Sequence, residues 1–94
     1  MQTTMEARAR ILIGGRVQGI FFRQFTKVNA DKLGLMGWVR NNEDGQVEVV
    51  VEGKKDKIDE LIKLLKKGPL LSSVSQIDIS WEKPTGEFLN FKII

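Results

Sequence analysis

The spacing of the apolar residues changes repeatedly along this chain of 94 residues, and this change restricts the fold more than any other feature. Apolar residues first alternate with other residues, as in a strand; they are Ala7, Ala9, Ile11 and Ile13. Gly14 and Gly15 are expected to end this strand. From about Phe22 to Leu33 the spacing becomes three and four, which predicts a helix, and Gly34 occupies the place of a C-terminal glycine cap.

The same two periods return further along the chain. Residues 36–41 and 46–52 are predicted to pair as a hairpin around the turn at 42–45, which carries an Asp-Gly signal. Three valines of the second strand should face inward: Val47, Val49 and Val51. A second helix is predicted from apolar residues at helical spacing, namely Ile58, Leu61, Ile62 and Leu65. Gly68-Pro69 should end this helix.

Two further strands complete the pattern. One is predicted from the alternation of Ile77, Ile79 and Trp81 with polar residues. The other covers residues 87–94 and has apolar residues on one face, namely Leu89, Phe91 and Ile93. The order is therefore βαββαβ with a short last strand. Two split βαβ units with right-handed crossovers predict an α+β, ferredoxin-like sandwich, in which a mainly antiparallel sheet carries both helices on one face.

Length and composition set further limits. Residues 1–94 are expected to form a single domain, because a chain this short supports one core. Met1 and Met5 are both candidate start residues, which makes residues 1–5 a candidate disordered extension. No run approaches the roughly 18 apolar residues of a membrane span, and the N-terminus lacks the apolar stretch of a secretory signal. The expected location is the cytoplasm, with no membrane partner.

The chain contains neither cysteine nor histidine. This excludes thiolate nucleophiles and cysteine metal sites, and it removes the commonest general base and metal ligand. Catalysis would have to rely on positioning and charge, through arginine, lysine, asparagine, carboxylates and backbone N–H groups. The net charge of +3 mildly favours anionic ligands but does not identify nucleic acid.

A glycine-bracketed segment follows the first strand. Residues 15–23 read GRVQGIFFR, in which Gly15 and Gly19 can adopt positive φ and let backbone N–H groups converge on a tetrahedral anion. Arg23 falls in the first turn of the predicted helix, where free N–H groups and the positive end of the helix dipole also point, so it would clamp that anion. The alternative is a tight strand-to-helix connection with a solvated Arg23.

The other side chains of this loop have simpler expected roles. The side chains of Arg16 and Gln18 are expected at the surface and need not touch a ligand. Of Ile20, Phe21 and Phe22, at least two should anchor the loop to the core. Phe21 is the one expected to be partly exposed at the mouth of the site.

Asn41 lies at the end of the predicted strand 36–41. It follows Val39 at a period of two, so both side chains should face the helices, with Asn41 at the rim of the sheet near the first loop. A carboxamide can accept a hydrogen bond from water and orient it as a nucleophile without being a strong base. The alternative is a role in the hairpin turn, which is the preferred role for Asn42.

Both loops resemble the two signature segments of the acylphosphatase family. Residues 15–23 are similar to its phosphate-binding segment, with Ile20 where valine is usual. Residues 37–41, which read GWVRN, and the later GQV at 45–47 resemble its second signature. The two segments occur in the expected order and separation, and the resemblance covers essentially the whole chain after Met5.

This resemblance implies hydrolysis of the carboxyl-phosphate bond of acyl phosphates to a carboxylate and inorganic phosphate, without a metal or another cofactor. It also implies that Arg23 binds the phosphate and that Asn41 orients the attacking water. The phosphate cradle would consist of the backbone N–H groups of Arg16, Val17, Gln18, Gly19 and Ile20. The expected partners are a small acyl phosphate and inorganic phosphate as product inhibitor, and the expected state is a monomer.

Two other classes of protein remain as alternatives. A ferredoxin-like nucleic-acid binder would use aromatic residues on its sheet, but the chain shows no aromatic-rich RNA-binding strand motif, so no nucleic-acid partner is expected. A regulatory module that binds a small anion without turnover would use Arg23 equally well. Such a module would have no need of Asn41.

Overall fold

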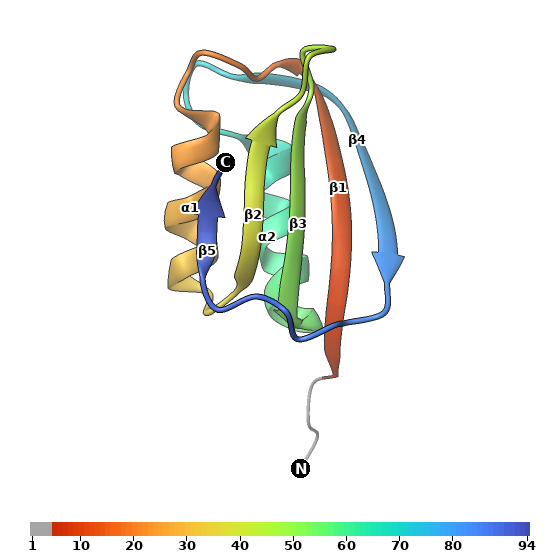
Figure 1. Ribbon diagram of the computed structural model, residues 1–94. Helices are drawn as coiled ribbons and strands as arrows, with labels where there is room; N and C mark the ends of the chain where they lie inside the picture. The colour runs from red at the N-terminus through yellow and green to blue at the C-terminus, as the bar shows by residue number, and fades with distance from the viewer. Residues whose placement is uncertain (1–4) are drawn as a thin grey trace.

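The secondary structure follows the predicted βαββαβ order with a short strand added at the end (Figure 1). The computed structural model describes residues 5–94, and its elements are β1 (Glu6–Arg16), α1 (Phe22–Lys32), β2 (Met36–Asn41), β3 (Val47–Lys54), α2 (Lys55–Lys67), β4 (Ser73–Glu82) and β5 (Phe91–Ile93). Of the expected extension over residues 1–5, all but Met5 lies outside the described residues. The Met5 carbonyl accepts a hydrogen bond of 2.8 Å from the Lys55 N–H.

The strands form one five-stranded sheet in the order β4-β1-β3-β2-β5. β1 pairs antiparallel with β3 and β4, and β2 pairs antiparallel with β3. β5 lies parallel to β2 at the edge of the sheet. Both helices cover the same face (Figure 1), which is the predicted α+β, ferredoxin-like arrangement of two split βαβ units.

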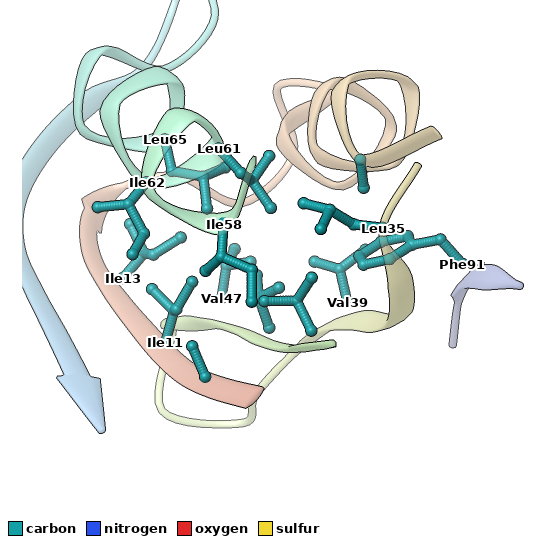
Figure 2. Close-up of a cluster of buried hydrophobic side chains, with 14 of the residues drawn as sticks. Ile11, Ile13, Leu35, Val39, Val47, Ile58, Leu61, Ile62, Leu65 and Phe91 are labelled. Atoms are coloured by element: carbon teal, nitrogen blue, oxygen red, sulfur yellow. The ribbon is translucent and has the colours of Figure 1, made fainter. Parts of the chain in front are cut away.

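The hydrophobic core lies between this sheet and its two helices (Figure 2). Alternate residues of the three central strands point into it and are fully buried: Ala9, Ile11, Ile13, Val39, Val47, Val49 and Val51. The predicted apolar stripe of α2 meets them and is buried as well: Ile58, Leu61, Ile62 and Leu65. Within residues 5–94, neither helix is long and apolar enough to cross a membrane.

The opposite face of the sheet carries a network of charged side chains beside apolar ones such as Val50. Arg8 on β1 forms ion pairs with Glu52 at 2.7 Å and with Glu82 at 2.9 Å. Arg10 on the same strand pairs with Glu82 and with Glu48, whose side chain is only 7% exposed. The two faces of the sheet are therefore distinguished by the period-two pattern of its strands.

Gly14 and Gly15 do not end β1, and the prediction that they would was wrong. The strand continues to Arg16, and its register against β4 shifts between the two glycines, which marks a β-bulge. Gly15 has φ of 119°, and a Cβ at this position would lie 2.2 Å from the Ser73 carbonyl oxygen. A bulge and a turn both call for glycine, so the sequence pattern does not distinguish them.

The last strand is also shorter than predicted. Only Phe91–Ile93 pair with the sheet, whereas residues 87–94 were expected to do so. Leu89, expected on the same buried face as Phe91, is 89% exposed, while Phe91 is 2% exposed. β5 is nevertheless important for the site, because its parallel pairing places Ile93 beside Val39 of β2.

Candidate active site

A pocket lies at the end of the sheet where the β1–α1 loop, the first turn of α1 and the last residues of β2 and β5 meet. Figure 1 shows the β1–α1 loop and the β2–β3 turn at this same end of the molecule. The pocket has a volume of about 320 Å³ and is lined by Val17, Gly19, Phe21, Phe22, Arg23, Gln24, Asn41 and Ile93. It therefore brings together the two polar residues, Arg23 and Asn41, that the sequence singles out.

The β1–α1 loop is held to the core at two points. Val17 and Phe22 are each 1% exposed. Ile20 packs against the core from a partly buried position, whereas Phe21 is 74% exposed. The prediction that at least two of the three residues 20–22 anchor the loop is thus confirmed. Between these anchors, Gly19 takes φ of 75°, so the backbone reverses direction at the pocket.

Gln18 joins the loop to the β2–β3 turn. Its Nε2 group donates hydrogen bonds of 2.9 Å to the carbonyl oxygens of both Asn42 and Gln46. The expected surface role was wrong for this residue, whereas Arg16 is exposed as expected. Because the bonded carbonyl of Asn42 follows Asn41 directly, Gln18 fixes the distance between the loop and the end of β2. A loop amide has no periodicity, so the sequence contains no signal for this contact.

The N-terminus of α1 is positively polarised and faces the pocket with Arg23 in its first turn. Phe21 is the N-cap residue, and no side chain caps the helix by a hydrogen bond. The first turn contains no acidic residue. Arg23 itself is half-buried and forms no ion pair within residues 5–94. Free N–H groups, the helix dipole and a guanidinium therefore favour an anion at this point.

Asn41 presents an oxygen that has no partner. It alternates with the buried Val39, so its side chain points to the helix side of the sheet. Its Oδ1 atom is buried and accepts no hydrogen bond from any residue in the described part of the chain. An unsatisfied buried acceptor costs roughly 1–3 kcal/mol, so a native structure that keeps one at a pocket wall calls for an explanation.

Asn42 has the turn role that was preferred for it. Its N–H donates to the Gln46 carbonyl at 2.8 Å, and its own carbonyl accepts from the Gly45 N–H at 3.2 Å. Its side-chain oxygen accepts a 3.1 Å bond from Arg40 Nε. The two adjacent asparagines thus differ: the side-chain oxygen of Asn42 accepts a hydrogen bond, whereas that of Asn41 has no partner in the described part of the chain.

Glu48 places a buried carboxylate on the outer face of the sheet, next to the end of β2. Glu48 on β3 accepts hydrogen bonds from Arg40 at 2.9 Å and from Arg10. Burial alone would raise the pKa of Glu48, but the hydrogen bonds from Arg40, Asn42 and Arg10 lower this pKa below its ordinary value. Glu48 therefore stays ionised and fixes Arg40, the residue next to Asn41, against the outer face of the sheet.

Comparison with known proteins gives this site its chemical context. The acylphosphatase family model matches residues 9–93. The chain belongs to the acylphosphatase family. An acylphosphatase of Roseiflexus sp. (strain RS-1) is 46% identical over 88 residues, which cover 94% of this chain and 95% of that protein. One of Pelotomaculum thermopropionicum is 42% identical over 87 residues, covering 93% and 95%.

The fold agrees with this family. The crystal structure of acylphosphatase from Bacillus subtilis superimposes with a TM-score of 0.90 at 36% identity, covering 96% of this chain and 99% of that one. The resemblance of the two signature segments to acylphosphatase is thereby confirmed, and the chain is an enzyme. The alternative of an anion-binding module without turnover is wrong.

Proposed function

We propose that the pocket between α1 and β2 is the catalytic centre in which this chain hydrolyses the carboxyl-phosphate bond of acyl phosphates. One observation carries the assignment: a buried, unpartnered Asn41 oxygen lines the same pocket as Arg23 and a helix N-terminus without acidic residues. The first group can hold a water molecule, and the other two favour an anion. Water and phosphate are the two components that the reaction brings together.

The phosphoryl group binds at the start of α1 in this proposal. In phosphoryl transfer, negative charge spreads over three phosphate oxygens, and converging N–H donors together with a guanidinium stabilise it. The backbone N–H groups of Arg16, Val17, Gln18, Gly19 and Ile20 form the cradle, and Arg23 provides the guanidinium. The positive φ of Gly19 and the open space beside its Cα support this assignment, because backbone can approach a ligand closely there.

Asn41 positions the nucleophile. Its free Oδ1 accepts a hydrogen bond from a water molecule, whose oxygen attacks phosphorus opposite the leaving carboxylate. The P–O bond to the acyl group breaks, the carboxylate leaves with the bonding electrons, and the water proton passes to a phosphate oxygen of the substrate. Because a carboxylate is a good leaving group and the transition state is loose, the water needs little deprotonation before attack.

The remaining properties follow from this mechanism. N–H groups and Arg23 take the place that a metal ion holds in many phosphoryl-transfer enzymes, so turnover is independent of added metal. Inorganic phosphate competes with the substrate, since both bind the cradle. We also propose that the protein acts as a cytoplasmic monomer without a nucleic-acid partner.

Paired variants of the two adjacent asparagines test the assignment. Asn41→Ala should lower kcat for acetyl phosphate by about a hundredfold or more, because misplacing a nucleophile by about 1 Å costs that much, while the Ki of inorganic phosphate stays near that of the parent protein. Asn42→Ala is the matched control. It should lower thermal stability by roughly 1 kcal/mol and leave kcat per folded molecule unchanged.

The activity measurements should be repeated with excess chelator, and the activity should persist. Normal turnover by folded Asn41→Ala would remove this residue from catalysis. Loss of phosphate binding together with turnover would mean that Asn41 shapes the cradle and does not orient water. If the chelator abolishes activity and Mg²⁺ restores it, the metal-free mechanism is wrong.

A further inference from the structure

Gln18 connects the two halves of the pocket, although its side chain does not line it. Its neighbours in the β1–α1 loop, Val17 and Gly19, both line the pocket. Its side-chain amide reaches the β2–β3 turn, where it contacts the residue that follows Asn41. The residue is therefore joined to the loop at the start of α1 through its backbone and to the end of β2 through its side chain.

The amide of Gln18 uses both of its N–H bonds. They donate to the carbonyl oxygens of Asn42 and Gln46 at 2.9 Å each. The Asn42 carbonyl also accepts the Gly45 N–H at 3.2 Å, and the Gln46 carbonyl accepts the Asn42 N–H at 2.8 Å. Each carbonyl oxygen thus has two donors, which match its two lone pairs. The contact fixes the turn relative to the loop in both direction and distance.

The sheet by itself does not set this distance. β1, which leads into the loop, and β2, which ends at Asn41, are separated by β3 in the strand order. The ladder between β1 and β3 ends at the pair Ile13 and Val47, so the loop lies beyond it. Among residues 5–94, the hydrogen bonds between residues 17–21 and residues 41–46 both come from the Gln18 amide. Without this amide, packing alone would hold the loop against the turn.

The separation between the loop and Asn41 determines where water meets phosphorus in the proposed reaction. In a reactive complex the attacking oxygen lies about 3–3.5 Å from the atom that it attacks. The cradle places the phosphorus atom, and the unpartnered Asn41 oxygen places the water. An error of about 1 Å in this separation costs about a hundredfold in rate. A contact that fixes the separation therefore acts on the rate without touching the substrate.

We infer that Gln18 is a positioning residue for catalysis: its amide holds the phosphate-binding loop at the distance from Asn41 at which the oriented water reaches phosphorus. This inference rests on the proposed function of the pocket. It gives the Gln18 side chain an effect on kcat that acts through Asn41. Phosphate binding depends instead on backbone N–H groups and Arg23. The loop is also anchored by the buried Val17 and Phe22, so the cradle keeps its shape without the amide.

Gln18→Met tests this inference, because methionine has nearly the length of glutamine but no N–H donor. With acetyl phosphate, kcat should fall by at least about tenfold, while the Ki of inorganic phosphate changes by less than about twofold. Gln18→Glu replaces the donor with an acceptor at the same position, should show the same separation of kcat from Ki, and serves if Gln18→Met does not fold. Gln76→Met is the matched control: the Gln76 amide donates to Asp78 at 2.9 Å on the edge strand β4, so its loss should leave kcat unchanged.

A double-mutant cycle with Asn41→Ala separates positioning from general support of the fold. If Gln18 acts through Asn41, adding Gln18→Met to Asn41→Ala should change kcat by less than about threefold, because no oriented water is left to misplace. Multiplication of the two separate losses would refute the inference, and so would a normal kcat in folded Gln18→Met. A rise in Ki as large as the fall in kcat would show that Gln18 shapes the cradle and would overturn it as well.

Failure of the proposed function gives a different result. It would appear as no hydrolysis of acetyl phosphate by the parent protein, or as a normal kcat in Asn41→Ala alone, and either result would remove the basis of this inference too. Failure of the inference by itself leaves the parent protein active and Asn41→Ala impaired, with the contradiction confined to the Gln18 variants.

Discussion

Glu52 provides the sharpest test of what stabilises this fold outside the core. Its side chain is 9% exposed. Its carboxylate accepts hydrogen bonds from Arg8 at 2.7 Å, from the N–H and hydroxyl of Thr85 at 2.9 and 3.0 Å, and from the Gly86 N–H at 3.0 Å. Thr85 and Gly86 belong to the connection between β4 and β5, which crosses the sheet at the end opposite the pocket (Figure 1). Glu52 therefore attaches this connection to the sheet.

The pKa of Glu52 gives the size of the effect. Burial alone would raise this pKa, but the hydrogen bonds from Thr85, Arg8 and Gly86 lower it from 4.5 to about 2. One pKa unit corresponds to about 1.4 kcal/mol, so the ionised carboxylate contributes about 3 kcal/mol to folding at neutral pH. Because the folded-state pKa is below the unfolded one, the unfolded chain binds more protons between these values. This stability is complete above about pH 4.5 and is lost as the pH falls towards 2.

Glu52→Gln keeps the shape of the side chain and removes its charge. It also turns an amide N–H₂ group towards donors that need an acceptor. At pH 7, urea denaturation should give a free energy of unfolding about 3 kcal/mol lower than that of the parent protein. The difference should shrink as the pH falls from 4.5 towards 2, because protonated Glu52 then resembles glutamine.

The matched control for this variant is Glu60→Gln on α2. The Glu60 side chain is 53% exposed and, among residues 5–94, forms one ion pair, with Lys57 at 3.5 Å, so its replacement should change stability by less than about 0.5 kcal/mol. A Glu52→Gln difference below 0.5 kcal/mol, or one that does not vary with pH, would refute the linkage argument.

Two further predictions concern the β1–α1 loop. Arg23→Ala should lower kcat/KM by at least about a hundredfold, and Arg23→Lys should recover little, because an ammonium cannot reproduce the fork of guanidinium donors; near-normal kinetics of either would exclude Arg23 from the site. Gly15→Ala should destabilise the protein by about 2 kcal/mol or more, since its Cβ would lie 2.2 Å from the Ser73 carbonyl oxygen. Gly86 has φ of 72° but open space around its Cα, so the control Gly86→Ala should destabilise the protein by only about 1 kcal/mol in a thermal melt.

The secondary structure was predictable because local patterns dominate it. Val47, Val49 and Val51 alternate and are all buried, as a half-buried strand requires. Gly34, with φ of 71°, follows the last turn of α1, and the Leu35 N–H reaches back to the Ala30 carbonyl at 2.9 Å. This is the glycine cap that the position of Gly34 indicated. In both cases the sequence signal that predicts the element lies within a few residues.

The features that the sequence did not reveal depend on contacts between distant segments. The position of β5 in the sheet is the first such feature. A three-residue strand has almost no periodic signal, and its parallel pairing with β2 is determined by tertiary packing. The Gln18 amide is another, since its two acceptors lie 24 and 28 residues later. The left-handed backbone of Phe21 is a third, because nothing in the residue type suggests it. Phe21 and Ile93 of β5 line the pocket, and Gln18 lies between its lining residues Val17 and Gly19, so sequence-based prediction fails mainly around the candidate site.

The pocket residue Asn41 is held from several sides, and this explains how its oxygen can remain unpaired. On the outer face, Glu48 fixes Arg40, the residue before it, while the hairpin and Gln18 fix Asn42, the residue after it. On the edge, the Ile94 N–H donates to the Val39 carbonyl at 2.9 Å, so β2 is bonded on both sides close to its end. The strand therefore cannot shift to bring a backbone donor to the Asn41 oxygen. In the proposed mechanism the Asn41 acceptor is thus oriented before water binds, as a preorganised site requires.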